Sequence, residues 1–169
     1  MAPVRRFGAP RLAILALGGA GGALLVVSDF LTLYHVDVLT ARCSDLASPN
    51  LRDACSTTGG GHHGYGLAII GALVLVMTWG AAIGSSRPAG AALLVLGGAA
   101  LLIVFAVDAP DIHRTGIVGE QFANAEANPT AGYWLEIVGA GLALGAGAVR
   151  LLSPRTKPRA SGTPTAYQR

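Results

Sequence analysis

Two long apolar runs separated by only four residues constrain this chain more than any other feature. They cover residues 67–84 and 89–107, are 18 and 19 residues long, and contain no charged residue. At about 1.5 Å of rise per residue, a helix of either length is close to the ~30 Å hydrocarbon core of a bilayer. The break between the runs reads SSRP and holds one charge, Arg87. The stretch therefore predicts a transmembrane helical hairpin with a very short turn.

The composition points to the same class of protein. Apolar residues make up 52% of the chain, charged residues only 12%, and 24 of the 169 residues are glycine. A soluble core of this length could not bury so much apolar surface, whereas helices in lipid can expose it and still satisfy their backbone polar groups. The runs do not alternate as strands of a membrane barrel do. The predicted fold class is all-α, an integral membrane four-helix antiparallel bundle.

We expect one membrane domain over residues 1–152, with four spans joined by two outer loops and one short inner turn. A basic start followed by an apolar run is also typical of a secretory signal, and cleavage of such a signal would leave three spans. The tail, residues 153–169, is basic and rich in proline and is expected to be disordered. The predicted spans are residues 12–33, 65–84, 89–107 and 132–152, and the predicted outer loops are residues 34–64 and 108–131.

The orientation follows from the distribution of charge. Nine of the twelve basic residues lie before the first span, in the short turn, or in and after the final turn of the last span, and no acid lies among them. All nine acids lie in or next to the two larger loops. By the positive-inside rule, both termini are cytoplasmic and the larger loops are outside. We expect a multi-pass protein of the plasma membrane whose tail binds anionic lipids.

The first outer loop contains the only two cysteines, Cys43 and Cys55. Disulfides persist outside the cell, so a structural disulfide is predicted; a redox or metal pair and two free thiols are the alternatives. Ser48 and Pro49 together indicate a helix start, which predicts a short helix over residues 49–55. Apolar residues at spacings of three and four between Val36 and Leu46 predict a second small helix before it.

Glycines four apart occur in three of the predicted spans. Small residues at this spacing allow helix backbones to approach closely in lipid, so they predict helix packing within the bundle. A face for a homo-oligomer or for another membrane protein, and chance, are the alternatives. The pairs are Gly18 with Gly22, Gly80 with Gly84, and Gly141 with Gly145, while Gly90 and Gly97 in the third span lie seven apart.

All four histidines and three span-end acids are expected on the outer side. If the bundle closes, these groups ring one mouth, and imidazole with carboxylate is a ligand set suited to zinc, copper or iron. The alternatives are an ion pair to Arg114 or Arg42, and plain solvation at the interface. The candidate metal ligands are His35, His62, His63 and His113, and the outer-mouth carboxylates are Asp29, Asp108 and Glu136.

The layout resembles that of uncharacterised four-span membrane proteins of high-GC actinobacteria. The similarity lies in a first span ending LLVVSDFLTLYHV, an inner Ser-Arg-Pro turn, a third span ending IVFAVDAP and a last span opened by GYWLEIVGAGLALGAG. The topology is also similar to that of claudin-like tetraspans, with two cysteines in the first outer loop, although the Gly-Leu-Trp signature of claudins is missing. Both resemblances imply a membrane fold, and neither of them implies a particular activity or particular site residues.

No motif for catalysis or phosphate binding occurs, and the sequence predicts no catalytic residue. We therefore expect a non-enzymatic accessory or structural subunit of a membrane or envelope complex, without nucleic acid as a partner. The alternative is a metal- or haem-dependent redox or sensing protein that uses the outer histidines.

Overall fold

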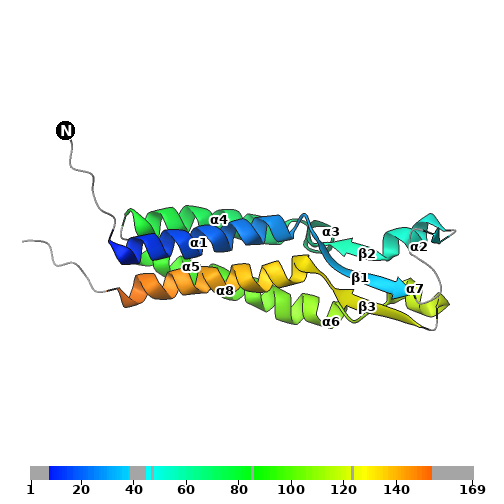
Figure 1. The fold of residues 1–169 in the computed structure, drawn as a ribbon. Coiled ribbons are helices and arrows are strands. Elements are labelled where there is room, and N and C mark those ends of the chain that lie inside the picture. The colour runs from blue at the N-terminus through cyan, green and yellow to red at the C-terminus, as the bar shows by residue number, and fades with distance from the viewer. Residues whose placement is uncertain (1–7, 39–44, 47, 85, 123, 154–169) are drawn as a thin grey trace, which may run out of the picture.

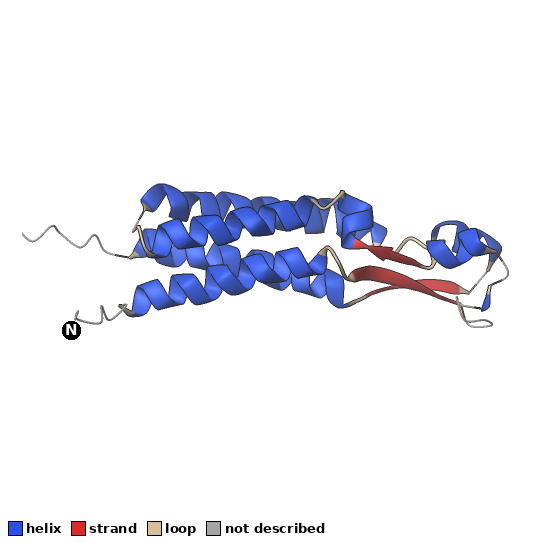
Figure 2. Ribbon diagram, turned by 90° about the horizontal axis from the view of Figure 1, so that it is seen from above, coloured by secondary structure: helices blue, strands red, loops and turns tan. Residues whose placement is uncertain are grey.

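The computed structural model describes residues 8–38, 45–46, 48–84, 86–122 and 124–153. Four long helices lie side by side, and a small sheet with short helices extends beyond one end of them (Figures 1 and 2). The start of the first long helix and the end of the last one both lie at the opposite end (Figure 1). The long helices are α1 (Ala9–Ser28), α4 (Gly66–Ala82), α5 (Arg87–Ile103) and α8 (Ala131–Leu152).

Three of these helices are long and apolar enough to cross a membrane, namely α1, α8 and the helical stretch that begins with α5. The 17-residue α4 is a shorter apolar helix. Large apolar side chains point outward along the bundle, including Val76, Trp79, Val95 and Leu102, each more than 60% exposed. Much of the buried core consists of alanine. Small residues inside and large apolar residues outside are the pattern of a membrane protein.

The close helix contacts are made at glycines. A Cβ atom on Gly21 would lie 2.7 Å from the Gly139 carbonyl oxygen, and one on Gly22 would lie 2.8 Å from that of Gly71. These contacts join α1 to α8 and to α4. A Cβ on Gly147 would lie 2.8 Å from the Gly90 carbonyl oxygen, which joins α8 to α5. Backbones that approach this closely leave no room for a side chain.

The glycines that were predicted from their spacing to pack helices differ in how closely they contact a neighbouring helix. Gly18 faces the Thr78 side chain, and a Cβ on Gly97 would lie 3.0 Å from the Ala140 carbonyl oxygen. A Cβ on Gly80 would make an ordinary contact with Ala89. The remaining three lie away from close interhelical contacts: Gly84 meets only the backbone of its own helix, Gly141 has nothing within 4 Å, and Gly145 meets only Leu17 at 3.8 Å.

The hairpin predicted from the two apolar runs is present as α4 and α5. The Ser86 side chain accepts a hydrogen bond from the Ala89 N–H, which caps the start of α5. Pro88 lies in the first turn, where its missing N–H has no intrahelical partner to lose. The turn is therefore short because α5 starts immediately after it.

A three-stranded antiparallel sheet lies beyond the end of the helices that is away from the start of α1 and the end of α8, so the all-α prediction is wrong. Its strands are β1 (Thr32–Val38), β2 (Ser56–Thr58) and β3 (Ala125–Pro129), in the order β2-β1-β3. β1 starts four residues after α1 ends, and β3 ends just before α8. The first span predicted over residues 12–33 therefore ends early as a helix, at Ser28.

The helix predicted between Val36 and Leu46 is wrong at its start, because residues 36–38 belong to β1, while residues 39–44 lie outside the described residues. Threonine, tyrosine and valine favour a pleated, half-buried strand, and pairing with two neighbours outweighs the helical spacing. A register shift between Thr32 and Tyr34 leaves Leu33 and Val36 buried three residues apart.

Short helices complete the outer part. The helix predicted over residues 49–55 is present as α2 (Pro49–Ala54), and α7 (Gly116–Gln121) lies near it. The side chains of Val36, Leu51, Cys55 and Val118 form a buried core with Leu46 and Ala127. Cys43 lies outside the described residues, so its disulfide with Cys55 stays a prediction.

Candidate metal centre

The histidine pair is positioned by a glycine-rich helix that packs on the end of α1. This helix, α3 (Gly59–His63), follows β2 directly. The Gly59 N–H donates to the Leu31 carbonyl at 3.1 Å and the Gly60 N–H donates to the Asp29 carbonyl at 2.6 Å. A Cβ on Gly59 would lie 2.8 Å from the Asp29 Cα, so a side chain at this position would separate the two segments. The glycines therefore hold His62 and His63 against the bundle.

Asp108 enters the site from a widened helical turn. The π-helical segment η2 (Val104–Asp108) continues α5, and the Ala109 N–H donates to the Val104 carbonyl, five residues back. Pro110 has no N–H to give to the carbonyl of residue 106, which disfavours a regular α-helical turn here. Val104 and Asp108, four residues apart, are both buried. The wide turn thus carries a carboxylate on the buried side of the helix.

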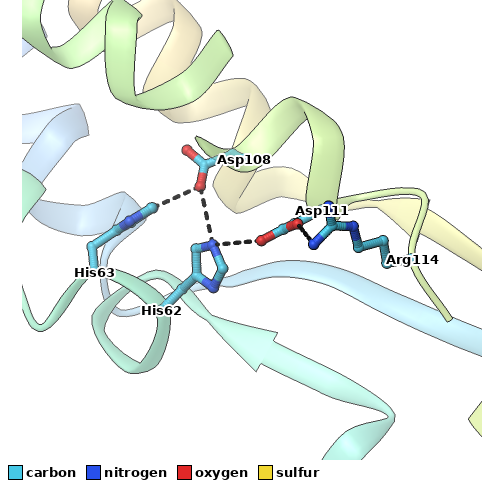
Figure 3. Close-up of polar contacts among 5 residues, drawn as sticks. All are labelled: His62, His63, Asp108, Asp111 and Arg114. Atoms are coloured by element: carbon cyan, nitrogen blue, oxygen red, sulfur yellow. Dashed lines mark ion pairs between the residues drawn. The ribbon is translucent and has the colours of Figure 1, made fainter. Parts of the chain in front are cut away.

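The two imidazole rings converge on one carboxylate oxygen of Asp108 (Figure 3). His63 Nε2 lies 2.8 Å from Asp108 Oδ1, and His62 Nε2 lies 3.6 Å from the same oxygen. One ligand atom from each residue lies within 4.8 Å of the other two. The imidazole rings meet edge to face with centroids 4.8 Å apart.

The cluster is almost closed to solvent. The Asp108 side chain is 1% exposed, that of His63 is 7% and that of His62 is 20%. In the part of the chain that the structure describes, both histidine Nε2 atoms are buried and have no partner beyond these ion-pair contacts. Buried polar atoms rarely lack hydrogen-bond partners in folded proteins, and a bound ion is one common explanation where they do.

Two more buried carboxylates lie beside Asp108. Asp29 is 1% exposed at the end of α1, and Glu136 is 0% exposed in the second turn of α8. The side chains of Glu136 and Asp108 are hydrogen-bonded to each other. Asp29 Oδ2 accepts a hydrogen bond from the Ala68 N–H at 2.6 Å, in the first turn of α4. The sequence left open the alternative that these carboxylates are simply solvated at the membrane interface, and their burial contradicts it.

Asp111 is a member of the cluster that sequence reasoning did not single out. It ends the short helix α6 (Ala109–Asp111), and its Oδ2 lies 3.4 Å from His62 Nε2. Its Oδ1 lies 2.9 Å from Arg114 Nη1, and the Arg114 side chain is 72% exposed. The arginine therefore pairs with Asp111 and not with Asp29 or Asp108, while Arg42 lies outside the described residues. The spacing of three between Asp108 and Asp111 was the available signal, because it places both on one helical face.

The other two candidate histidines lie elsewhere. His35 is in β1, and its Nε2 lies 3.0 Å from Oδ2 of Asp37, with both side chains largely exposed. His113 is exposed in the turn after α6. The structure therefore selects two of the four histidines for the cluster.

Imidazole nitrogen and carboxylate oxygen are borderline ligands that suit zinc and other divalent transition metals. Two atoms bound to one zinc ion at about 2.0–2.1 Å lie about 3.3 Å apart in tetrahedral geometry. The separations of 2.8 and 3.6 Å bracket that value. Asp111 Oδ2 lies 3.4 Å from His62 Nε2 and flanks the group of three, which does not include it.

Taken together, the apolar helices indicate a membrane protein, and it carries a buried histidine and carboxylate cluster where the helices meet the small sheet. Comparison of the chain with protein-family models, curated proteins and solved structures gives no match.

Proposed function

We propose that this protein is a small accessory membrane protein that binds one divalent transition-metal ion, zinc being the best fit, at the outer end of its helices. The observation that carries the proposal is the convergence of His62, His63 and Asp108 in a buried position. Among the described residues, the two facing imidazole nitrogens have no partner beyond their ion-pair contacts to Asp108 and Asp111. A bound ion would satisfy all three side chains at once.

The ion would act as a clamp between two parts of the molecule. The histidines lie on α3, which is joined directly to β2 of the outer sheet, whereas Asp108 ends the helix that continues α5. A metal bridging them would fix the outer part on the bundle. Such a role is non-enzymatic and suits a protein that presents a small outer domain to other components of the envelope or senses metal outside the cell.

The same proposal includes four spans, both termini in the cytoplasm and a plasma-membrane location. The 17 residues of α4 extend about 25 Å, which a locally thin bilayer or the flanking residues Tyr65 and Ile83 can accommodate. The described ends of the chain lie together, away from the sheet, and the basic residues flank them. Under the positive-inside rule this arrangement favours a sheet on the outer surface.

The test is zinc binding by the purified full-length protein in a neutral detergent. Wild-type protein, a His62→Ala/His63→Ala double variant and a His113→Ala control are stripped with a chelator, reloaded and analysed for zinc per chain. Wild type and the control are expected to retain about one ion each, while the double variant loses it. His113 is a matched control because it is a histidine of the same outer region that lies in an exposed turn.

Two results would overturn the proposal. One is a folded wild-type protein that retains no zinc, copper, iron or manganese after loading. The other is a folded double variant that binds as much metal as the wild type, since the ion would then lie elsewhere. Helical content by circular dichroism identifies which variants remain folded.

A further inference from the structure

Three exposed aromatic side chains lie at the end of the long helices that is nearest the sheet. One follows the C-cap residue of α1, one is the N-cap residue of α4, and one lies in the first turn of α8. Each of them is more than half exposed, although large aromatic side chains usually bury most of their surface. We call Phe30, Tyr65 and Trp134 the aromatic belt.

The belt residues lie at one level along the bundle. The Phe30 and Tyr65 rings pack together with their centroids 5.8 Å apart. A Cβ on Gly132 would lie 2.5 Å from the carbonyl oxygen of Thr32, so the start of α8 touches the chain two residues after Phe30. Trp134 lies two residues further along α8, which is about 3 Å of helix. Three helices therefore present an aromatic side chain within about one helical turn of each other along the bundle.

The exposed surface changes its chemical character at this level. About one turn further from the sheet, each of the three helices exposes an aliphatic side chain instead, namely Val27, Ile69 and Val138. On the side of the sheet, the exposed groups include the ion pair of His35 with Asp37. The belt thus separates an apolar surface from a polar one. Tryptophan and tyrosine are enriched at such a boundary in membrane proteins, because each has an apolar ring and a polar tip.

We propose that the aromatic belt binds the layer of the outer leaflet in which the lipid headgroups meet the acyl chains. The Trp134 indole N–H and the Tyr65 hydroxyl donate hydrogen bonds to headgroup and ester oxygens there, while the rings lie against the acyl chains. A lipid layer fits this surface better than a partner helix does. Because α1 lies between α4 and α8 (Figure 1), the belt extends around the bundle, and one helix about 10–12 Å wide would cover only part of it.

The belt also gives the depth of the proposed metal centre. Tyr65 follows His63 by two residues in the chain. Trp134 precedes Glu136 by two residues, and the Glu136 side chain is hydrogen-bonded to that of Asp108. The histidine and carboxylate cluster therefore lies at the depth of the headgroups, and an ion reaches it through the headgroup layer. This inference rests on the proposed four-span arrangement and does not require a bound ion.

Tryptophan fluorescence measures the depth of the belt, because Trp79 and Trp134 are the only tryptophans in the chain. The full-length Trp79→Phe variant is reconstituted in phosphatidylcholine vesicles that carry a quenching spin label near either the headgroup end or the methyl end of the acyl chain. The ratio of quenching by the shallow label to quenching by the deep label is expected to exceed one. Phe30→Trp and Tyr65→Trp, each made in a Trp79→Phe/Trp134→Phe background, are expected to give the same ratio as Trp134.

Two controls in the background without native tryptophans calibrate this ratio. Val138→Trp is exposed on the same face of α8 as Trp134, four residues and about 6 Å deeper, so its ratio is expected to be lower. Val95→Trp is exposed at the middle of α5, and its ratio is expected to fall below one. Helical content by circular dichroism identifies which variants remain folded.

The outcomes separate the belt from the four-span arrangement. Belt tryptophans that are quenched more by the deep label would overturn the inference, because the boundary would then lie further out. Belt tryptophans that respond to neither label, while Val95→Trp responds to the deep one, would overturn it as well, since water or a second copy of the chain would then cover the belt. If Val95→Trp also responds to neither label, the four-span arrangement itself is wrong.

Discussion

The closest helix contact provides a test of the fold that is independent of any ligand. In the substitution Gly21→Ala the new methyl group would lie 2.7 Å from the Gly139 carbonyl oxygen and 2.8 Å from the Ala143 backbone nitrogen. Both are backbone atoms, so no side chain can turn aside to relieve the contact. Ordinary contact begins at 3.4 Å, so α1 and α8 would have to separate by about 0.7 Å.

The magnitude follows from comparison with Gly19→Ala in the same helix. A Cβ on Gly19 meets nothing within 4 Å. Both substitutions gain the same helix propensity, about 1 kcal/mol, so this term cancels in their difference. What remains is the overpacking cost, typically about 1–3 kcal/mol, since a gap of this size forfeits a quarter to a half of the dispersion attraction along the interface.

Thermal unfolding of both variants in the same neutral detergent measures the difference. At about 2–4 °C per kcal/mol for a chain of this size, Gly21→Ala should melt between about 2 and 12 °C below Gly19→Ala. Gly147→Ala and Gly141→Ala form a second pair with the same contrast, because Gly147 abuts the Gly90 carbonyl and Gly141 faces open space. Equal melting temperatures within each pair would refute the packing described for α8.

Three further outcomes are expected. In a variant without native cysteines, Ser161→Cys should react with an impermeant thiol reagent only after the cells are opened; labelling of intact cells would contradict a cytoplasmic tail. Non-reducing mass spectrometry should find Cys43 bonded to Cys55, a closure that stabilises the outer domain by about 3 kcal/mol, and two alkylated thiols would exclude the bond. Deleting residues 156–169 should leave the melting temperature unchanged and weaken binding to anionic vesicles at low salt, whereas a large loss of stability would mean that the tail packs on the bundle.

The long helices were predictable because lipid leaves the chain few alternatives. The runs at 67–84 and 89–107 match α4 and the helix formed by α5 with η2 to within a few residues, since uncharged runs of this length satisfy their backbone in a bilayer only as helices. The sheet was not predictable in the same way. β3 reads AEANP, a sequence with little strand propensity, and it is a strand because β1 lies beside it.

The sequence by itself determined which side chains were available at the outer end, since the charge distribution and the span lengths place Asp29, Asp108, Glu136 and the histidines there. Only the tertiary structure decided which of them meet. His62 and Asp108 are far apart in the chain, and their contact depends on two glycines, Gly59 and Gly60, that pack α3 on the end of α1 and on a π turn before Pro110. Spacing along one helix cannot report a contact between different helices, because that contact is set by how closely their backbones approach.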